Sequence, residues 1–163
     1  MKINSVGDTM LERLGHEIKN QWMTMQAYPD MSPDLGLRRK LARQHQSRPN
    51  YSRLEWHHRL WRSLGVRNEV SEFIYDALTE HTGLEVGRFL ASDRLVADLQ
   101  LPSICWFDWE VVCMEQFWQR FQLPEPELED WDTAFDPTTF DTLQDWVLFL
   151  NQTVNQHRGS VGL

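Results

Sequence analysis

The stretch ASDRLVADLQLPSICWFDWEVVCMEQFWQRF, residues 91–121, decides the fold class expected for this chain. Up to Pro102 its apolar residues follow no regular period, which is typical of a loop anchored to a core. From Ser103 onward apolar side chains recur at helical spacing, and serine is a preferred residue at a helix N-terminus. We therefore expect a long loop followed by an aromatic helix over residues 103–122.

Two apolar stripes run along this expected helix. The first repeats every three or four residues and would face a helical core: Ile104, Phe107, Val111, Met114, Trp118 and Phe121. The second lies on another side: Trp106, Trp109, Cys113 and Phe117. One stripe is enough to bury a helix, so the second predicts either a cover from the same chain or a docking surface for a partner. Leu54, Trp61 and Leu64 would supply such a cover, and this is the favoured alternative.

Four further helices are expected from caps, amphipathic periodicity and stop residues. They cover about residues 9–28, 53–64, 68–82 and 142–156. The helix at 68–82 is the most regular, because its apolar residues recur along one face and Gly83 follows as a stop. No segment shows the alternation of apolar and polar residues that is typical of a strand. The chain is therefore expected to be all-α.

Charge is distributed unevenly along the 163 residues. Residues 1–68 contain 12 Lys or Arg against 6 Asp or Glu, and residues 69–163 contain 4 against 18, which together give the net charge of −8. A basic and an acidic part indicate two units with different surfaces that can attract each other. We expect a basic helical extension at residues 1–67, a helical bundle at 68–156 and a flexible tail at 157–163.

Several function classes have little support in the sequence. No apolar run is long enough to span a bilayer and the first residues lack the apolar core of a signal peptide, so we expect no membrane partner and a cytoplasmic location. Glycine-rich, P-loop, serine-hydrolase and zinc-protease motifs do not occur, so we do not expect an enzyme. His57 and His58 would point about 100° apart on a helix, so we expect no metal site. Cys105 and Cys113 are expected to be reduced thiols.

The segment from Arg38 to Arg67 contains nine of the sixteen Lys and Arg residues. Tyr51, Trp56 and Trp61 lie among them, a composition that suits binding phosphates while stacking bases. The same cations can instead bind the acidic part of this chain or an acidic partner. Nucleic acid is the less favoured partner, and the sequence leaves the alternatives open.

The order of elements in residues 68–156 resembles the acyl carrier protein fold, a small four-helix bundle. The loop ASDRLVADLQLPSI and the closing stretch FDTLQDWVLFLNQ carry the resemblance. It implies that Asp98 and Leu99 match an Asp-Leu pair of that family. It also implies that Ser103 matches the serine that carries 4′-phosphopantetheine, while Pro102 stands where the family has an aspartate. The basic extension lies outside the resemblance.

Ser103 has two interpretations. A hydroxyl at a helix N-terminus can carry a phosphoester, since the helix dipole favours the anion, or the serine can serve only as a helix cap. Because Pro102 replaces the aspartate that a modifying transferase would recognise, we first expect a non-catalytic adaptor that docks a protein partner through the aromatic helix. The expected docking residues are Trp106, Asp108, Trp109, Glu110, Cys113 and Phe117. A carrier with 4′-phosphopantetheine on Ser103 is the second expectation, and nucleic-acid binding through residues 38–67 is the third.

Overall fold

The computed structural model describes residues 32–124 and 139–160. The chain divides into two compact units, Met1–Pro33 and Asp34–Leu163, and the elements given below all belong to the second. The helix predicted for residues 9–28 lies outside the described residues.

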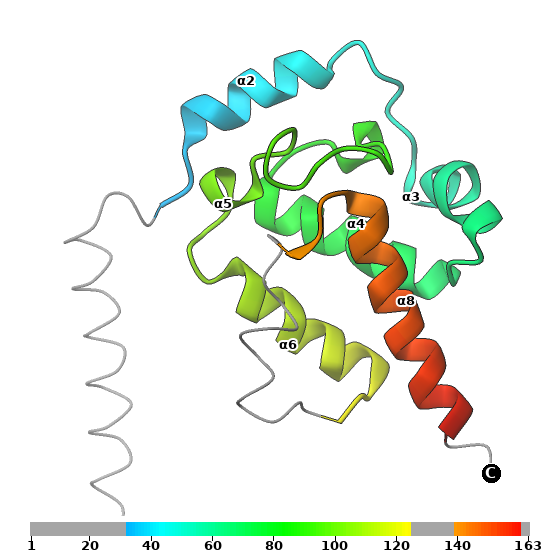
Figure 1. The fold of residues 1–163 in the computed structure, drawn as a ribbon. Helices are drawn as coiled ribbons and strands as arrows, with labels where there is room; N and C mark the ends of the chain where they lie inside the picture. The colour runs from blue at the N-terminus through cyan, green and yellow to red at the C-terminus, as the bar shows by residue number, and fades with distance from the viewer. Residues whose placement is uncertain (1–31, 125–138, 161–163) are drawn as a thin grey trace, which may run out of the picture. The chain divides into compact units, whose positions relative to one another are not determined.

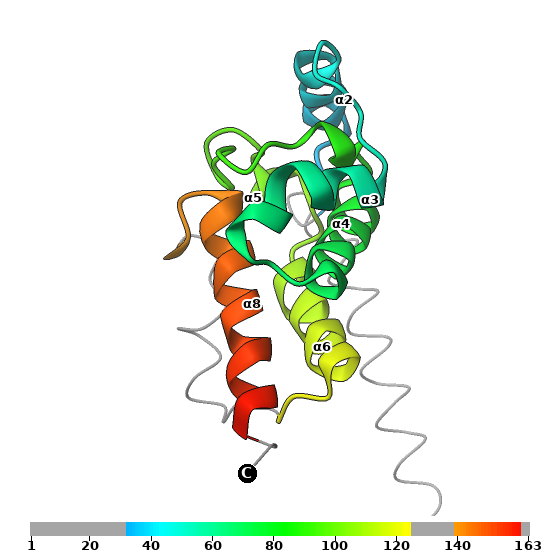
Figure 2. The ribbon, with the colours of Figure 1, turned by 90° about the vertical axis from the view of Figure 1, so that its right-hand side faces the viewer.

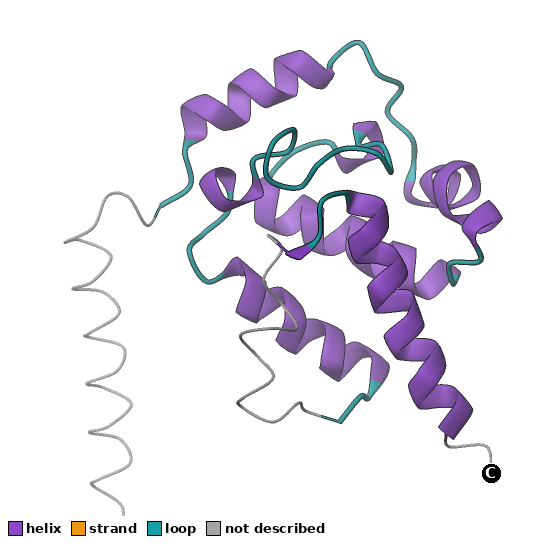
Figure 3. Ribbon diagram, in the orientation of Figure 1, coloured by secondary structure: helices purple, strands orange, loops and turns teal. Residues whose placement is uncertain are grey.

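The described residues are helical, which confirms the all-α fold class (Figure 3). Outside helices, their backbone pairing includes one isolated antiparallel bridge, between Arg94 and Thr142. None of the described helices is both long enough and apolar enough to cross a membrane. Figure 1 shows the elements, which in chain order are α2 (Leu35–His45), α3 (Arg53–Trp56), a π-helical turn η2 (His57–Trp61), a 3₁₀ turn η3 (Arg62–Leu64), α4 (Asn68–Thr82), a 3₁₀ turn η4 (Val86–Arg88), α5 (Leu101–Ile104), α6 (Trp109–Phe121) and α8 (Leu143–Ser160).

Helix α4 is central to the packing, in contact with α3, η2, α6 and α8 (Figures 1 and 2). It has the predicted bounds, and Gly83 ends it in the left-handed conformation at φ 66°. Its predicted apolar face is confirmed, with Phe73 half-buried and four residues buried: Val70, Ile74, Ala77 and Leu78. The same core includes Leu41, Trp56 and Trp61 from before residue 67. The boundary between a basic extension and a helical bundle at residue 67 stays a prediction, although residues on both sides of it contribute to one core.

The helix predicted for residues 53–64 begins as expected but changes its winding. Ser52 and Glu55 form the predicted capping box, and Gly65 ends the segment at φ 72°. Between them the chain passes from an α turn into the π turn η2 and the 3₁₀ turn η3. A π turn stacks residues that are five apart, so Trp56 and Trp61 both point inward and their ring centroids lie 5.1 Å apart.

The change of winding overturns part of the predicted apolar face of the segment, which comprised Leu54, His57 or His58, Trp61 and Leu64. Trp61 and His57 are buried as predicted. Leu54 and Leu64 were expected to point inward with Trp61, but they are 57% and 40% exposed. Trp56, which the α-helical period had placed elsewhere, is fully buried, and its Nε1 donates to the carbonyl of Phe89 at 3.0 Å.

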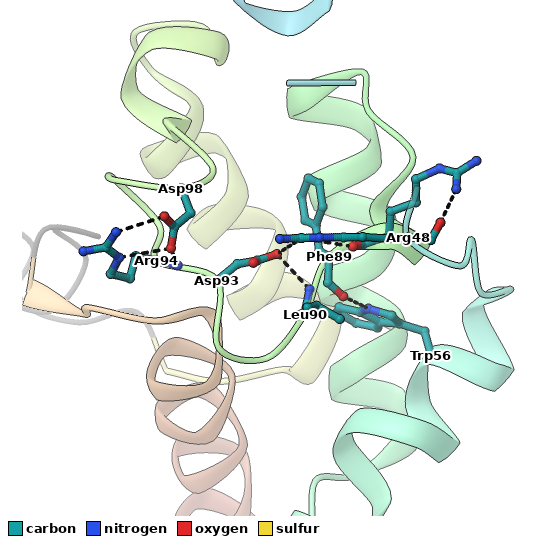
Figure 4. Close-up of polar contacts among 8 residues, drawn as sticks. Arg48, Trp56, Phe89, Leu90, Asp93, Arg94 and Asp98 are labelled. Atoms are coloured by element: carbon teal, nitrogen blue, oxygen red, sulfur yellow. Dashed lines mark hydrogen bonds and ion pairs between the residues drawn. The ribbon is translucent and has the colours of Figure 1, made fainter. Parts of the chain in front are cut away.

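A network of polar contacts fastens the chain after α2 to the loop at residues 84–100 (Figure 4). Arg48 Nη1 donates to the buried Asp93 carboxylate at 2.7 Å and to the Arg88 carbonyl at 3.3 Å. The same Asp93 oxygen accepts the Leu90 N–H at 2.8 Å. Five apolar side chains were expected to anchor this loop, and four of them are buried: Val86, Phe89, Leu95 and Leu99. The fifth, Leu90, is half-buried.

Gly87 is the point of closest approach in this network. The Tyr51 N–H donates to the Gly87 carbonyl at 3.1 Å. A Cβ added to Gly87 would lie 2.0 Å from the Tyr51 carbonyl oxygen and 2.4 Å from Asn50 Oδ1. Only glycine fits where two backbones approach this closely.

Helix α8 closes the described part of the chain. The sequence predicts Asp141 or Thr142 as the cap of this helix, and the structure has Thr142 there. Its Oγ1 accepts the Asp145 N–H at 3.2 Å, while the Asp145 carboxylate accepts the Thr142 N–H at 3.1 Å. The tail predicted from residue 157 is helical as far as Ser160. The acidic connection predicted before α8 lies outside the described residues from 125 to 138.

Candidate functional site

The aromatic helix predicted as one element is interrupted. Residues Leu101–Ile104 form the single turn α5, and α6 begins only at Trp109. Between them Cys105 adopts an extended conformation, at φ −95° and ψ 166°. This interruption allows Ile104 and Trp109 both to be buried. The prediction of a continuous helix over residues 103–122 is therefore wrong.

Ser103 is not at the N-terminus of a long helix. It is the third residue of the four-residue α5, and Gln100 occupies the cap position in the left-handed conformation at φ 51°. Its backbone N–H donates to the Gln100 carbonyl at 3.0 Å, and its own carbonyl accepts the Asp34 N–H at 3.0 Å. The Ser103 side chain is exposed. The predicted capping role is thus wrong. The helix dipole that would favour a phosphoester there comes from a single helical turn and is therefore weak.

Three of the predicted docking residues are buried within this chain: Trp109, Cys113 and Phe117. The Trp109 ring lies 6.3 Å from the His81 ring and 6.2 Å from the Trp146 ring, measured between centroids. The stripe that was predicted to be a second surface is therefore a core stripe, because it faces α4 and α8. We correct the earlier interpretation for these residues, since buried side chains offer no surface to a partner.

The cover predicted for this stripe is also wrong. Leu54 and Leu64 are exposed, and Trp61 packs against Trp56. Phe73 of α4 supplies part of the actual cover, with its ring centroid 5.4 Å from that of Phe117.

The exposed apolar side chains of this region lie in the connection between α5 and α6 and in the first turn of α6. Trp106, Phe107 and Val111 are 42%, 55% and 48% exposed. We call these three residues the joint patch. Phe107 and Val111 had been predicted to face the core. Trp106 had been predicted as a docking residue and is exposed, and its docking role stays a prediction. A contiguous exposed apolar patch is one of the features that mark interaction sites, whereas single exposed apolar residues are common.

Acidic side chains flank the joint patch. Asp108 and Glu115 are exposed, and Glu110 is half-buried. Asp108 occupies the N-cap position of α6, and Glu110 lies in its first turn, where the helix dipole favours negative charge. Asp108 and Glu110, which were also predicted as docking residues, therefore lie next to the joint patch in the chain.

The first turns of helix α2 are hydrogen-bonded to α5 and to the end of α4. Arg38 Nε donates to the Ile104 carbonyl at 2.7 Å, and its Nη2 donates to the His81 carbonyl at 3.0 Å. Together with the hydrogen bond from Asp34 to Ser103, these contacts join α2, α4 and α5. Leu35, which follows Asp34 in the chain, is 58% exposed at the start of α2.

The buried titratable groups near the connection between α5 and α6 are poorly reactive. Burial raises the pKa of the Cys105 and Cys113 thiols to about 12, so almost no thiolate forms at neutral pH. Burial also lowers the pKa of His81, which keeps its ring neutral. Neither thiol is suited to act as a nucleophile.

A second pair of polar side chains, His57 and Ser71, is a structural contact. His57 Nδ1 lies 2.7 Å from Ser71 Oγ, but that hydroxyl donates to the Asn68 carbonyl at 2.9 Å and both side chains are buried. The serine proton is thus already used and no substrate can reach it. Within residues 32–124 and 139–160, no group of three His, Cys, Asp or Glu side chains is arranged to hold a metal ion.

A groove of about 460 Å³ lies between α4 and α6, and positively and negatively charged side chains line it. Its polar lining comprises Arg53, Glu72, Asp76, Glu80, Gln116 and Arg120, and Phe73 and Ala77 supply the apolar part. Arg53 and Asp76 form an exposed ion pair at 2.7 Å, which neutralises one of each charge.

Comparisons with protein-family models, with curated proteins and with solved structures gave no match to this chain. The resemblance to acyl carrier proteins therefore stays a prediction.

Sequence reasoning missed Phe107 and Val111 as surface residues. Asp108 is the signal that would have found them, because an aspartate followed by Glu110 is a helix start. A helix that starts at Asp108 has a different rotational phase from one that starts at Ser103. The break before α6 exposes Phe107 and Val111 of the stripe that had been assigned to the core, whereas the other four residues of that stripe are buried as predicted: Ile104, Met114, Trp118 and Phe121.

Proposed function

We propose that this chain is a non-catalytic adaptor that docks a protein partner through the joint patch. The observation that carries the proposal is that Trp106, Phe107 and Val111 are each about half exposed beside an otherwise buried aromatic helix. Tryptophan and phenylalanine are the side chains that most often supply binding energy at interfaces.

The partner expected at this surface is an apolar protein segment. Trp106 and Phe107 lie in the short connection between α5 and α6, between the buried residues Cys105 and Trp109, so a partner that covers these exposed rings gains affinity from their burial. The buried thiols and the shielded His57–Ser71 pair described above offer no nucleophile for chemistry, which favours binding over catalysis.

The experiment is a pull-down with the full chain as bait, followed by titration of the purified partner. Combined replacement of Trp106→Ser, Phe107→Ser and Val111→Ser should weaken binding by at least about 30-fold, because each lost apolar contact contributes on the order of 1 kcal/mol. The matched control is Leu54→Ser with Leu64→Ser, which changes exposed apolar residues elsewhere. A partner that binds both variants equally would refute the joint patch as the docking surface.

A carrier function through Ser103 is the second candidate, supported by the exposure of this side chain beside the joint patch. Incubation with coenzyme A, magnesium and a promiscuous phosphopantetheinyl transferase should then add one 4′-phosphopantetheine to the intact mass. Ser103→Ala should remove the gain. No gain in the wild type, while a known carrier is modified in the same tube, rules this candidate out.

A further inference from the structure

The cations of the basic segment divide into two sets in the structure. Six of the nine between residues 38 and 67 contact groups of this chain, namely backbone carbonyls, carboxylates, a histidine or a tyrosine ring: Arg38, Arg48, Arg53, Arg59, Arg62 and Arg67. The other three are Arg39, Lys40 and Arg43, all exposed on α2. Within the described residues, none of these three has a carboxylate at ion-pair distance.

These three cations share the outer side of α2. The inner side contributes Leu41 and His45 to the packing, while Arg39 and Arg43 are four residues apart and therefore lie above one another on the exposed side. Lys40 lies beside them, and α2 itself contains no acidic residue. We call Arg39, Lys40 and Arg43 the basic face. Figures 1 and 2 show α2 at one edge of the described unit.

An exposed apolar residue, Leu35, lies in line with the basic face at the start of α2. Leu35, Arg39 and Arg43 follow at intervals of four residues along one line of α2, and Leu35 is exposed next to the contact between Asp34 and Ser103. At a rise of about 1.5 Å per residue, the line from Leu35 to Arg43 is about 12 Å long. An extended or helical segment of a partner can therefore contact apolar and basic surface together.

We infer that the partner of the joint patch is an acidic peptide segment whose carboxylates bind the basic face of α2 while its apolar side chains cover the joint patch. This inference rests on the proposed docking function and adds the partner's chemistry to it. Charge complementarity carries it, since the three cations of the basic face have no carboxylate partner among the described residues, whereas the other six cations between residues 38 and 67 contact groups of this chain.

The surface favours an acidic peptide over a nucleic acid. A nucleic acid carries a phosphate on every nucleotide, so a strand along α2 that reached the joint would also bring phosphates to Asp108 and Glu115. A peptide can separate its charges, with carboxylates over α2 and apolar residues at the joint. The apolar residue Leu35, in line with Arg39 and Arg43, matches this separation.

The test is fluorescence anisotropy of the full chain with a labelled synthetic peptide that has four glutamates followed by Leu-Trp-Leu-Phe. A peptide with glutamine in place of glutamate is the reference for charge. We expect the basic-face variant, Arg39→Gln with Lys40→Gln and Arg43→Gln, to bind the acidic peptide about 10-fold more weakly at low salt. The difference should shrink at 0.3 M salt, because exposed ion pairs are screened. Glutamine keeps the helix propensity of Arg and Lys, so α2 should stay folded by circular dichroism.

Arg120→Gln is the matched control, since Arg120 is an exposed arginine on α6 with no ion pair to another described residue. It should leave the affinity unchanged.

Each outcome separates the two proposals. If the basic-face variant binds within twofold of wild type while the joint-patch variant loses binding, the acidic partner is refuted and the docking function survives. If the joint-patch variant binds both peptides normally, the docking function fails and this inference fails with it. No saturable binding of the acidic peptide at low salt also overturns the inference. Tighter binding of single-stranded RNA than of the peptide, lost in the basic-face variant, replaces it with nucleic-acid recognition.

Discussion

Replacement of Gly87 by alanine should destabilise the fold more than any other single-methyl addition at a described glycine. The new Cβ would lie 2.0 Å from the carbonyl oxygen of Tyr51 and 2.7 Å from its nitrogen, and both atoms are backbone. Because neither atom can rotate away, the two segments must separate by more than about 1 Å to reach ordinary contact. Overpacking of this kind typically costs about 1–3 kcal/mol.

Separation of the segments has a second cost in hydrogen bonds. The Tyr51 N–H donates to the Gly87 carbonyl at 3.1 Å, and the Tyr75 hydroxyl donates to the Tyr51 carbonyl at 3.1 Å. Loss of a partly buried hydrogen bond adds about 1 kcal/mol. We therefore expect Gly87→Ala to lower the free energy of unfolding by about 2–4 kcal/mol, which corresponds to a Tm lower by roughly 5–15 °C for a chain of this size.

The assay is urea denaturation of the full chain, followed by tryptophan fluorescence. Gly159→Ala is the control, because a Cβ there meets no atom within 4 Å and alanine is favoured in a helix. The control should match or slightly exceed the wild-type stability. A free energy of unfolding for Gly87→Ala within about 0.5 kcal/mol of wild type would refute the close approach of the two backbones.

Three further predictions follow from local features. Thr142→Ala should lower the free energy of unfolding by about 1 kcal/mol in the same assay, because it removes the N-cap of α8; an unchanged midpoint would contradict the cap. Iodoacetamide at pH 8 should label Cys105 and Cys113 slowly in the native chain and rapidly in urea, because burial raises the pKa of both thiols to about 12; equal rates by mass spectrometry would contradict their burial. Burial lowers the pKa of His45, His57 and His81 below 6.5, so the unfolded chain binds more protons and stability should fall as the pH is lowered from 7.5 through 6.5; denaturation midpoints that stay constant down to pH 5.5 would contradict this.

Local signals in the sequence were sufficient for the ends of several helices. The capping box of Ser52 and Glu55, the stop at Gly83 and the cap at Thr142 each depend on residues within one turn of the chain. Such features are determined by backbone conformation and short hydrogen bonds, which the identity of a few neighbours fixes. The buried face of α4 could also be predicted from the sequence, because its apolar residues form one stripe and only one side of the helix can therefore face the core.

The winding of residues 53–64 could not be inferred in the same way. An α-helical period places Trp56 and Trp61 on different sides, and the sequence alone gives no reason to depart from it. The π turn η2 becomes favourable only because the core accommodates both rings, and because the Phe89 carbonyl is present to accept from Trp56 Nε1. Phe89 is distant in sequence, so the contact that selects the winding is a tertiary one.

The candidate site was misassigned because both apolar stripes contribute to one core. Periodicity shows that a helix has two apolar sides, but it does not show which side faces inward. The structure buries most of both stripes. Trp109 and Phe117 meet rings on α4 and α8 (His81, Trp146 and Phe73), and Met114, Trp118 and Phe121 of the other stripe are buried too. The interruption at Cys105 then turns Phe107 and Val111 outward. Their exposure is thus a consequence of burying the larger rings, and it leaves on the surface the side chains that the proposed partner would cover.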